Sequence, residues 1–484
     1  MNLLVMSLVS AAALSFTSCS SNDDLAGNSG QEKVNGFYMT LNVQTPKSDG
    51  TRTVVNTPTE AATAEESDVT SGTIYLVDAT DAIVFQKNIT EAEWKAGQKP
   101  TQGKNGSTQI KIEVEKVVAG ATYKVYFLAN HTDAKPWENI FTAKNKFAKP
   151  YDTNNKFAMF NQNDKAVKGN GYTVVFTDAN RKEDNAAHIK YDNADSPIKI
   201  ERLTARIDEP TSNATKIVAY TGTDATEAEK RAMKDAVDKV ESIKMTGYAI
   251  SNLSNKSYIM QNWTGATLNI PSDITYYQPT KEFGTATLLE NGNYFTAATA
   301  PNTHKDYVFE NNNENAATSM YFEYTVKLKD DGTAADFSDG TFYRYNNVIY
   351  KSFTDIYKHY NDVVGLFDNK TAEQMKDELI KAKAAPTVTT DPTVESKLDE
   401  FRKKYKIEVF NCGKTYYKKA IKDQYLTYEN AIQRNSIYRL TVNNIFNVGA
   451  QVPNGAPDKD VLFYLDVTVS VNPWVLNTQN IDFK

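Results

Sequence analysis

The chain has 484 residues, with 54 Lys and Arg against 60 Asp and Glu and a formal net charge of −6 at pH 7. This length exceeds one ordinary hydrophobic core, so two large domains are expected. Because the net charge is negative, the composition gives no sign of a basic surface that would bind phosphates, which argues against a nucleic-acid partner. The only cysteines are Cys19 and Cys412, so stability is expected from core burial and β-pairing rather than from disulfides.

The chain begins with a short apolar run that ends in small residues and Cys19, followed by a polar tract over residues 20–30. This pattern is typical of a secretory signal closed by a lipoprotein cleavage site, with Cys19 acylated. The run is shorter than the roughly 20 residues that cross a bilayer. A buried N-terminal helix is the alternative. On the first interpretation the protein leaves the cytoplasm.

The first predicted strand follows this tract. Its apolar residues alternate with polar ones, which indicates a strand with one buried face; they are Phe37, Met39, Leu41 and Val43. A Gly-containing loop with the first arginine of the chain, Arg52, comes next. Exposed loops of this kind are preferred sites of proteolysis, although Arg52 could also be an incidental loop residue.

The rest of the chain shows short strands separated by turn-rich polar segments, which favours β-sandwiches over a βαβ arrangement. We therefore predict an all-β fold, β-rich with helical insertions, whose first domain ends near residue 210. Strands are predicted over residues 73–77, 82–86, 109–114, 122–128, 172–176, 198–207, 242–250, 293–297, 320–328, 406–409, 414–421, 436–446 and 461–471. Helices are predicted over residues 224–240, 353–384 and 394–405.

The last strand has the clearest pattern. Apolar residues occupy every second position, and Pro473 interrupts the run before Trp474 and an apolar tail; the alternating residues are Phe463, Leu465, Val467, Val469 and Val471. This end of the chain is expected to be buried, either in its own domain as an ordinary edge strand or elsewhere.

Four segments spread over the chain resemble the fimbrilin family of Bacteroidales, and within it the shaft subunits of the short fimbriae. They are IERLTARI (200–207), APNTHKDYVFE (300–310), RNSIYRLTVNNIFNVG (434–449) and LDVTVSVNPWVLNTQNIDF (465–483). The resemblance implies two transthyretin-like β-sandwich domains, export as a lipoprotein, and proteolytic removal of the first strand after an arginine. It also implies polymerisation, in which the C-terminal strand of one subunit fills the groove vacated in the next. The insertions over 353–405 match nothing in this resemblance.

Carried onto this sequence, the resemblance assigns lipidation to Cys19 and cleavage to the Arg52-Thr53 bond. The removed strand would carry Phe37, Met39, Leu41 and Val43, and the donor strand Phe463, Leu465, Val467, Val469, Val471 and Trp474. The implied divisions are 1–19 (signal peptide), 20–52 (tether and removable strand), 53–210 and 211–460 (two β-sandwich domains) and 461–484 (donor strand).

The implied partners are other copies of the chain head-to-tail, tip and anchor subunits, and a surface receptor that the sequence does not identify. The precursor would be an outer-membrane lipoprotein and the product a cell-surface fimbria that mediates adhesion. The alternative function is a surface glycan-binding lipoprotein with aromatic platforms at Trp94, Trp137 and Trp263. An enzyme is not expected, since the sequence has no G-x-S-x-G elbow.

No cofactor or metal is expected, because the four histidines have no partner at metal-ligand spacing. They are His131, His188, His304 and His359. For His304 we predict a structural hydrogen-bonding role.

Overall fold

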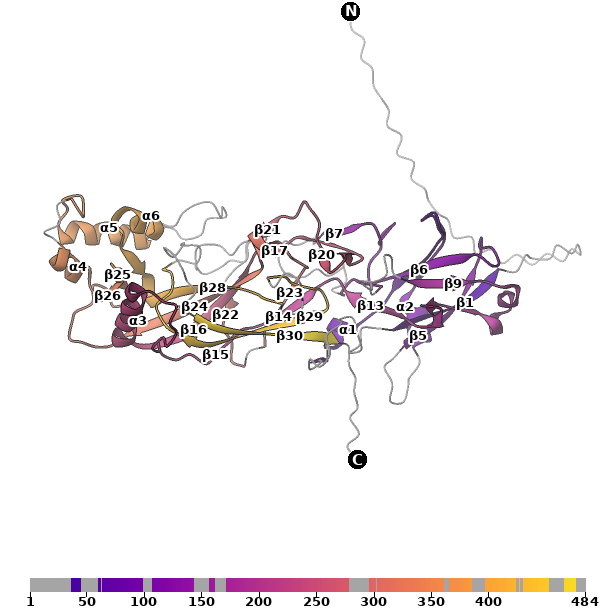
Figure 1. Cartoon of the computed structure of the whole chain (residues 1–484), viewed down its shortest axis with the longest axis horizontal. Helices are drawn as coiled ribbons and strands as arrows, with labels where there is room; N and C mark the ends of the chain where they lie inside the picture. Colours follow the sequence, from indigo (N-terminus) through magenta and orange to yellow (C-terminus); the bar gives the residue numbers. More distant parts are fainter. Residues whose placement is uncertain are drawn as a thin grey trace, which may run out of the picture.

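The computed structural model describes residues 36–44, 60–61, 63–98, 107–142, 156–161, 171–277, 296–301, 303–360, 365–384, 397–423, 426, 430–451 and 465–475. The molecule is elongated: the first sheet lies at one end and a group of helices lies at the other (Figure 1). Strands predominate in both halves, which confirms the predicted β-rich, β-sandwich fold. In the described part of the chain, no helix is both long and apolar enough to cross a membrane.

The first half is one sheet of eleven described strands, wrapped around its own hydrophobic core. The path runs β10-β1-β13-β8-β6-β9-β11-β12, with β5 against β1, β3 against β6, and β4 against β3. The strands are β1 (Phe37–Gln44), β3 (Gly72–Val77), β4 (Ile83–Ile89), β5 (Ser107–Val114), β6 (Thr122–Ala129), β8 (Met159–Asn161), β9 (Tyr172–Val175), β10 (Ala187–His188), β11 (Lys190–Tyr191), β12 (Ala194–Asp195) and β13 (Ile198–Arg202).

The second half is a sandwich of two sheets that share one core, with Ile207, Tyr248, Phe322 and Leu440 among its buried residues. One sheet follows the order β2-β30-β29-β14-β23, with β15 also on β29, and the other follows β22-β16-β24-β28. The strands are β2 (Glu60–Ala61), β14 (Ala205–Asp208), β15 (Thr211–Ser212), β16 (Val240–Ser251), β22 (Thr296–Ala297), β23 (Lys305–Val308), β24 (Ser319–Leu328), β28 (Lys414–Ala420), β29 (Ser436–Ile445) and β30 (Leu465–Val475).

A helical region extends the second half at the end far from β1 (Figure 1). Its helices α4 (Phe353–Tyr360), α5 (Ala372–Ala384) and α6 (Lys397–Tyr405) pack with a small sheet of β25 (Phe342–Tyr345), β26 (Val348–Tyr350) and β27 (Glu408–Phe410) around a separate core. The helix α3 (Glu227–Lys239) begins with a capping box between Thr226 and Glu229. α3 and α6 confirm the helices predicted over residues 224–240 and 394–405. The helix predicted over residues 353–384 is instead two helices, α4 and α5, with turns at residues 365–369 before α5.

Short elements complete the described fold. They are α1 (Ala64–Ser67), α2 (Glu91–Gly97), β7 (Ile140–Thr142), β17 (Leu253–Ser254), β18 (Lys256–Tyr258), β19 (Asn262–Thr264), β20 (Thr267–Asn269), β21 (Tyr276–Tyr277) and 3₁₀ turns at Asp178–Arg181, Glu183–Asn185, Glu314–Ala316 and Asn411–Gly413. β7 pairs with β18, and one hydrophobic cluster takes side chains from both halves.

The single strand predicted over residues 198–207 is wrong, because the chain changes sheets inside it. β13 ends in the first sheet, β14 begins in the second, and Leu203 and Thr204 lie between them. The Leu203 N–H donates to the carbonyl of Ala158 at 3.1 Å, and the Thr204 carbonyl accepts from Asn435 N–H at 2.8 Å. The domain limits at residue 210 stay a prediction, since strand pairing does not test independent folding.

Candidate functional site

The strand β1 lies inside the first sheet. It pairs with β5 along its whole length, from Phe37↔Val114 to Gln44↔Ser107. On its other side, two residue pairs join it to β10 and two to β13 in the described structure. The inward side chains are almost fully buried: Phe37 5%, Met39 0%, Leu41 0% and Val43 1% exposed. Removing β1 would therefore leave unpaired backbone groups along an apolar slot.

The outward face of β1 borders a cavity of about 410 Å³. It lies where the neighbour of β1 changes from β10 to β13, between the pairs Thr40↔His188 and Val43↔Ile198. Asn42 lines this cavity, and its buried Oδ1 has no hydrogen-bond partner in the described structure. The β10–β13 side thus holds β1 less continuously than the β5 side.

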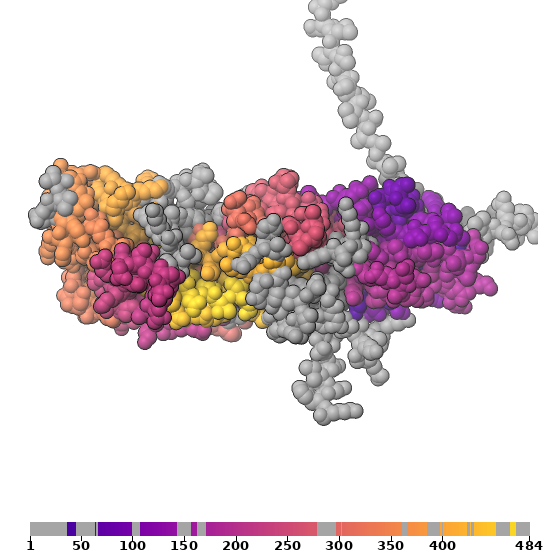
Figure 2. Space-filling view, in the orientation of Figure 1, coloured from indigo at the N-terminus to yellow at the C-terminus, as the bar shows by residue number. Residues whose placement is uncertain are grey.

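The C-terminal strand β30 lies near the edge of the second sandwich. It pairs with β29 from Ile445↔Leu465 to Ser436↔Pro473, whereas β2 covers its other side at two residues, Glu60↔Trp474 and Ala61↔Val475. The alternation predicted for this strand is present over residues 465–470, where even-numbered positions are exposed. Leu465 is 8% exposed, and Val467 and Val469 are only partly buried. The strand is visible on the surface in yellow (Figure 2).

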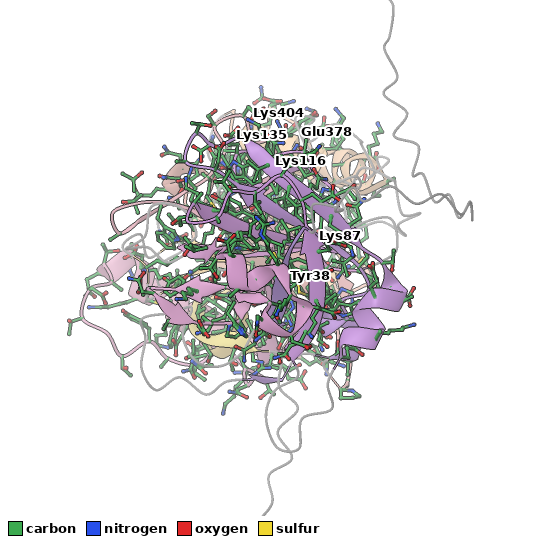
Figure 3. All side chains as sticks on the ribbon, turned by 90° about the vertical axis from the view of Figure 1, so that its right-hand side faces the viewer. Tyr38, Lys87, Lys116, Lys135, Glu378 and Lys404 are labelled. Atoms are coloured by element: carbon green, nitrogen blue, oxygen red, sulfur yellow. The ribbon has the colours of Figure 1, made fainter. Side chains whose placement is uncertain are left out.

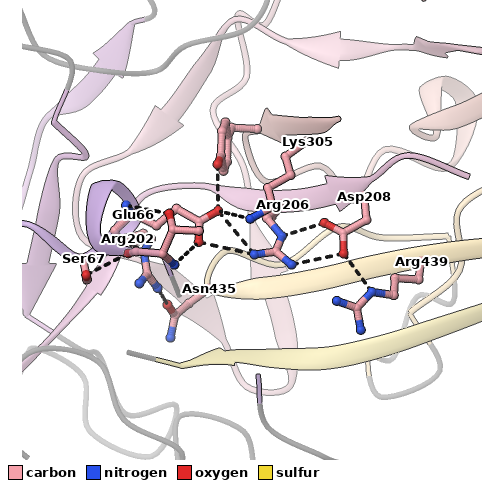
Figure 4. Close-up of polar contacts among 10 residues, drawn as sticks. Glu66, Ser67, Arg202, Arg206, Asp208, Lys305, Asn435 and Arg439 are labelled. Atoms are coloured by element: carbon pink, nitrogen blue, oxygen red, sulfur yellow. Dashed lines mark hydrogen bonds and ion pairs between the residues drawn. The ribbon is translucent and has the colours of Figure 1, made fainter. Parts of the chain in front are cut away.

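A buried carboxylate, Glu66, lies in α1 at the junction between the two halves (Figure 4). Its side chain is 1% exposed and accepts hydrogen bonds from the Tyr307 hydroxyl at 2.7 Å, Thr63 N–H at 2.7 Å and Arg206 Nη1 at 3.3 Å. Lys305 Nζ lies 3.6 Å away. Burial favours a raised pKa, but these hydrogen bonds and charges outweigh it, so the pKa of Glu66 lies below its ordinary value.

The same network continues in both directions. Arg202 Nε donates to the carbonyl of Glu66 at 2.7 Å, and its Nη1 donates to Asn435 Oδ1 at 2.9 Å. Arg206 Nε donates to Asp208 Oδ1 at 2.6 Å, and Arg439 Nε donates to Asp208 Oδ2 at 2.7 Å. The network connects α1 with β13, β14, β23 and β29, and so fixes the residues after the predicted cleavage loop to both halves.

A second buried ion pair joins Arg434 and Glu310, whose side chains are 0% and 2% exposed and 2.8 Å apart. Arg434 Nη1 also donates to the carbonyl of Ile259 at 2.8 Å. Glu201 is buried near this pair. Burial raises the pKa of Glu201, Arg434 opposes that shift and Glu310 adds to it, and the resulting pKa is about 8.

The raised pKa of Glu201 predicts a pH-dependent stability. Because the unfolded chain releases this proton near pH 4.5 and the folded protein keeps it to about pH 8, stability falls as pH rises across that window. Glu201→Gln should remove this loss, so its melting temperature should exceed that of the wild type by a few degrees at pH 8 and match it near pH 4. Thermal unfolding at both pH values tests this. Glu241→Gln, which alters an exposed pair with Lys327, is the control. A lower melting temperature for Glu201→Gln at both pH values would refute it.

Three of the segments that carry the resemblance meet at this junction. β14, from residues 200–207, lies between β23 and β29, which come from residues 300–310 and 434–449. The side chains of the two buried networks come mainly from these segments. In this structure the three segments therefore connect the two halves.

Several predicted site residues lie outside the described residues: Cys19, Arg52, Thr53 and Phe463. β30 includes Val471 and Trp474, but the structure describes only their backbone pairing. Lipidation, cleavage and strand exchange therefore stay predictions. The structure does bring the four β1 residues together on one buried face and places Leu465, Val467 and Val469 on the inner face of β30.

The tryptophans proposed as glycan platforms are mostly packed in the protein. The proposal is wrong for Trp94, which is 2% exposed and stacks on Phe127 with ring centroids 5.6 Å apart. Trp137 stacks on Tyr126 at 4.6 Å. Trp263 is partly buried, and its Nε1 donates to Gln261 Oε1 at 2.8 Å.

His304 is held by hydrogen bonds, in agreement with its predicted structural role. Its backbone N–H donates to Glu209 Oε2 at 3.1 Å, and its Nε2 lies 3.3 Å from Asp306 Oδ1. The Asp306 contact raises the pKa of His304. In the described part of the chain, no group of three or more His, Cys, Asp or Glu residues is arranged to hold a metal ion.

Residues 403–480 match the family model of the major fimbrial subunit protein type IV, fimbrillin, C-terminal. Over these residues the chain is similar to the fimbrilin family. This match covers β28, β29 and β30 and confirms the family resemblance. A search of curated proteins finds no relative of this chain.

Two solved structures of low identity are similar to this chain over most of its length. A candidate cell adhesion protein from Parabacteroides distasonis ATCC 8503 is 13% identical, with a TM-score of 0.45, over 92% of this chain and 99% of the other. A fimbrilin from Porphyromonas gingivalis W83 is 15% identical, with a TM-score of 0.44, over 92% of this chain and 100% of the other. Because both TM-scores are below 0.5, neither likeness assigns a fold or a function to this chain.

Proposed function

We propose that this protein is a fimbrilin, a structural subunit of a cell-surface fimbria that mediates adhesion. It is exported as a lipoprotein through Cys19, cleaved after Arg52, and polymerised by strand exchange with copies of itself. Tip and anchor subunits would end the polymer. The observation that carries this proposal is the contrast between β1, whose inward side chains are fully buried inside the first sheet, and β30, whose inward side chains are in part only half-buried near an edge.

The position of β1 in the chain supports its removal. It is the first described strand, and residues 45–59, which contain Arg52, connect it to β2. After a cut in that connection, only hydrogen bonds and apolar contacts would hold β1 in the sheet. A strand from another chain could then replace it with the same backbone pairing.

The burial of the two strands supplies a driving force. Val467 and Val469 are partly exposed in their own sandwich, whereas the inward side chains of β1, which fill the slot, are 0–5% exposed. Full burial of such a side chain contributes about 1.5–3 kcal/mol relative to full exposure, so transfer into the slot gains part of this amount at each position. Because the donor strand and the slot lie on different surfaces, the contact does not close on itself and propagates as a filament.

Cleavage and assembly can be tested on the intact protein. N-terminal sequencing of surface protein should begin at Thr53, and cleavage after Arg52 in vitro should produce ladders on gels of unboiled samples. Deleting residues 461–484 should abolish the ladders. Cleaved protein that forms equal ladders without those residues would exclude them as the donor, and surface protein that retains Cys19 with its acyl group would exclude maturation at Arg52.

A further inference from the structure

We propose that the C-terminal strand of a second copy enters the slot in one register and in the direction of β1, with Phe463 in the place of Phe37. This inference rests on the proposed strand exchange. Residues 37–44 read FYMTLNVQ and residues 463–470 read FYLDVTVS. Both begin with Phe-Tyr, alternate aliphatic with polar residues, and place a valine at the seventh position. In this register every inward residue of β1 is replaced by an apolar residue of similar size.

One end of the slot selects an aromatic side chain. The ring centroids of Phe37 and Phe176 lie 5.5 Å apart, and the guanidinium of Arg181 lies 4.2 Å from the centroid of the Phe37 ring. A cation over a ring face is a favourable contact that an aliphatic side chain cannot replace. Phe463 is the only aromatic residue among the alternating positions 463–471. A shift by two residues would place Leu465 or Val461 beneath Arg181.

The remaining inward positions accept the replacement with little change in volume. Leu465 would take the place of Met39, Val467 that of Leu41, and Val469 that of Val43. Swaps that nearly conserve volume are tolerated well in packed cores. A shift by one residue would instead turn Asp466, Thr468 and Ser470 into the core, because the side-chain period of a strand is two.

The outward face provides a second marker of register. Thr40 lies opposite Lys111 of β5 and opposite His188 of β10, and all three line the cavity beside β1. In the proposed register Asp466 takes the place of Thr40, between these two basic side chains. Asp195 also lines the cavity, and Lys111 has exposed contacts with Glu183 and Asp184 at 3.6 and 3.9 Å. The contact of Asp466 with Lys111 and His188 therefore supports the register, whereas the aromatic pocket around Phe37 determines it.

The outer rim of the slot is also reproduced. Tyr38 of β1 is partly exposed on the end of the molecule that carries the first sheet, as the view along the long axis shows (Figure 3). Tyr464 would restore a tyrosine at this position. The proposed joint thus keeps both the inner and the outer aromatic residue of the strand that it replaces.

Cysteine cross-linking distinguishes this register from its neighbours. In a Cys412→Ser background, Lys111→Cys is combined with Asp466→Cys, or with Thr468→Cys as the matched control. Cleavage after Arg52 also removes Cys19. Directly opposite residues have Cβ atoms about 4.5–5.5 Å apart, closer than diagonal ones, so mild oxidation should link copies through the first pair at least about tenfold more than through the second. In its own chain Asp466 pairs with Asn444, so the product should be an intermolecular disulfide.

The possible failures are separable. Equal or stronger linking through Thr468→Cys would overturn the register while leaving strand exchange intact. Ladders with neither disulfide would show that the slot holds the strand in another register or holds another segment, and either result overturns the proposed register. If cleaved wild-type protein forms no ladders, the proposed function itself fails.

A second variant tests the aromatic pocket without changing the slot. Phe463→Leu should slow ladder formation by about threefold to tenfold, whereas Leu465→Met, which restores the residue that β1 has at this position, should leave the rate within twofold. Equal rates for wild type and Phe463→Leu would contradict the pairing of Phe463 with this pocket.

Discussion

Replacing Leu41 with alanine is expected to destabilise the uncut protein by about 2–5 kcal/mol, because it opens a cavity in a packed core. Leu41 is 0% exposed in the middle of β1 and belongs to the core of the first half. If β1 leaves after cleavage, however, the same substitution should not change the stability of the assembled polymer. Denaturant unfolding of uncut protein and the melting temperature of unboiled ladders measure the two quantities.

The control for Leu41→Ala is Leu76→Ala in β3. Leu76 is also 0% exposed and belongs to the same core, but β3 stays in the chain after cleavage. Leu76→Ala should therefore weaken both the uncut protein and the polymer. If Leu41→Ala lowers polymer stability as much as Leu76→Ala does, β1 remains in the assembled subunit and the exchange proposal is wrong.

Replacing Arg206 with alanine is expected to destabilise the uncut protein by about 3–5 kcal/mol, because it leaves the buried Glu66 without its guanidinium partner. Arg206 is 1% exposed and contacts both Glu66 and Asp208. Its loss should also raise the pKa of Glu66, since one of the charges that lower it disappears. Denaturant unfolding measures the change.

Arg439→Ala provides the matched control for Arg206→Ala. Arg439 contacts the same Asp208, but its side chain is 38% exposed, and exposed pairs contribute at most about 1 kcal/mol. The double variant Glu66→Leu with Arg206→Met should recover part of the stability lost in Arg206→Ala, because it removes both charges of the pair together. Equal, small effects of Arg206→Ala and Arg439→Ala would show that the junction does not depend on this network.

The sequence predicts those strands in which apolar residues alternate with polar ones and one face is buried. Alternation in residues 37–43 and 465–470 gives β1 and the inner face of β30, because a strand has a side-chain period of two. Two local signals were missed. Thr90 and Glu93 form a capping box that begins α2, and Asn346 and Asn347, both at positive φ, make the turn between β25 and β26.

The junction could not be predicted from local pattern. Glu66 lies in a polar segment with no apolar periodicity, and its partner Arg206 is 140 residues away. Its burial depends on tertiary contacts that bring α1 onto β14 and β23. Glu201 and Arg202 appear as charged residues at the end of a predicted strand, and nothing in that pattern indicates that both are buried. The crossing between sheets at Leu203 and Thr204 was missed for the same reason.

The fate of β1 after cleavage tests the central claim most directly. Purified protein is cut after Arg52 and separated by size, and each fraction is analysed by denaturing mass spectrometry for the fragment that contains Phe37–Gln44. The account predicts that monomers retain this fragment and that oligomers lose one copy for each joint formed. Oligomers that keep the fragment at every subunit would contradict strand exchange.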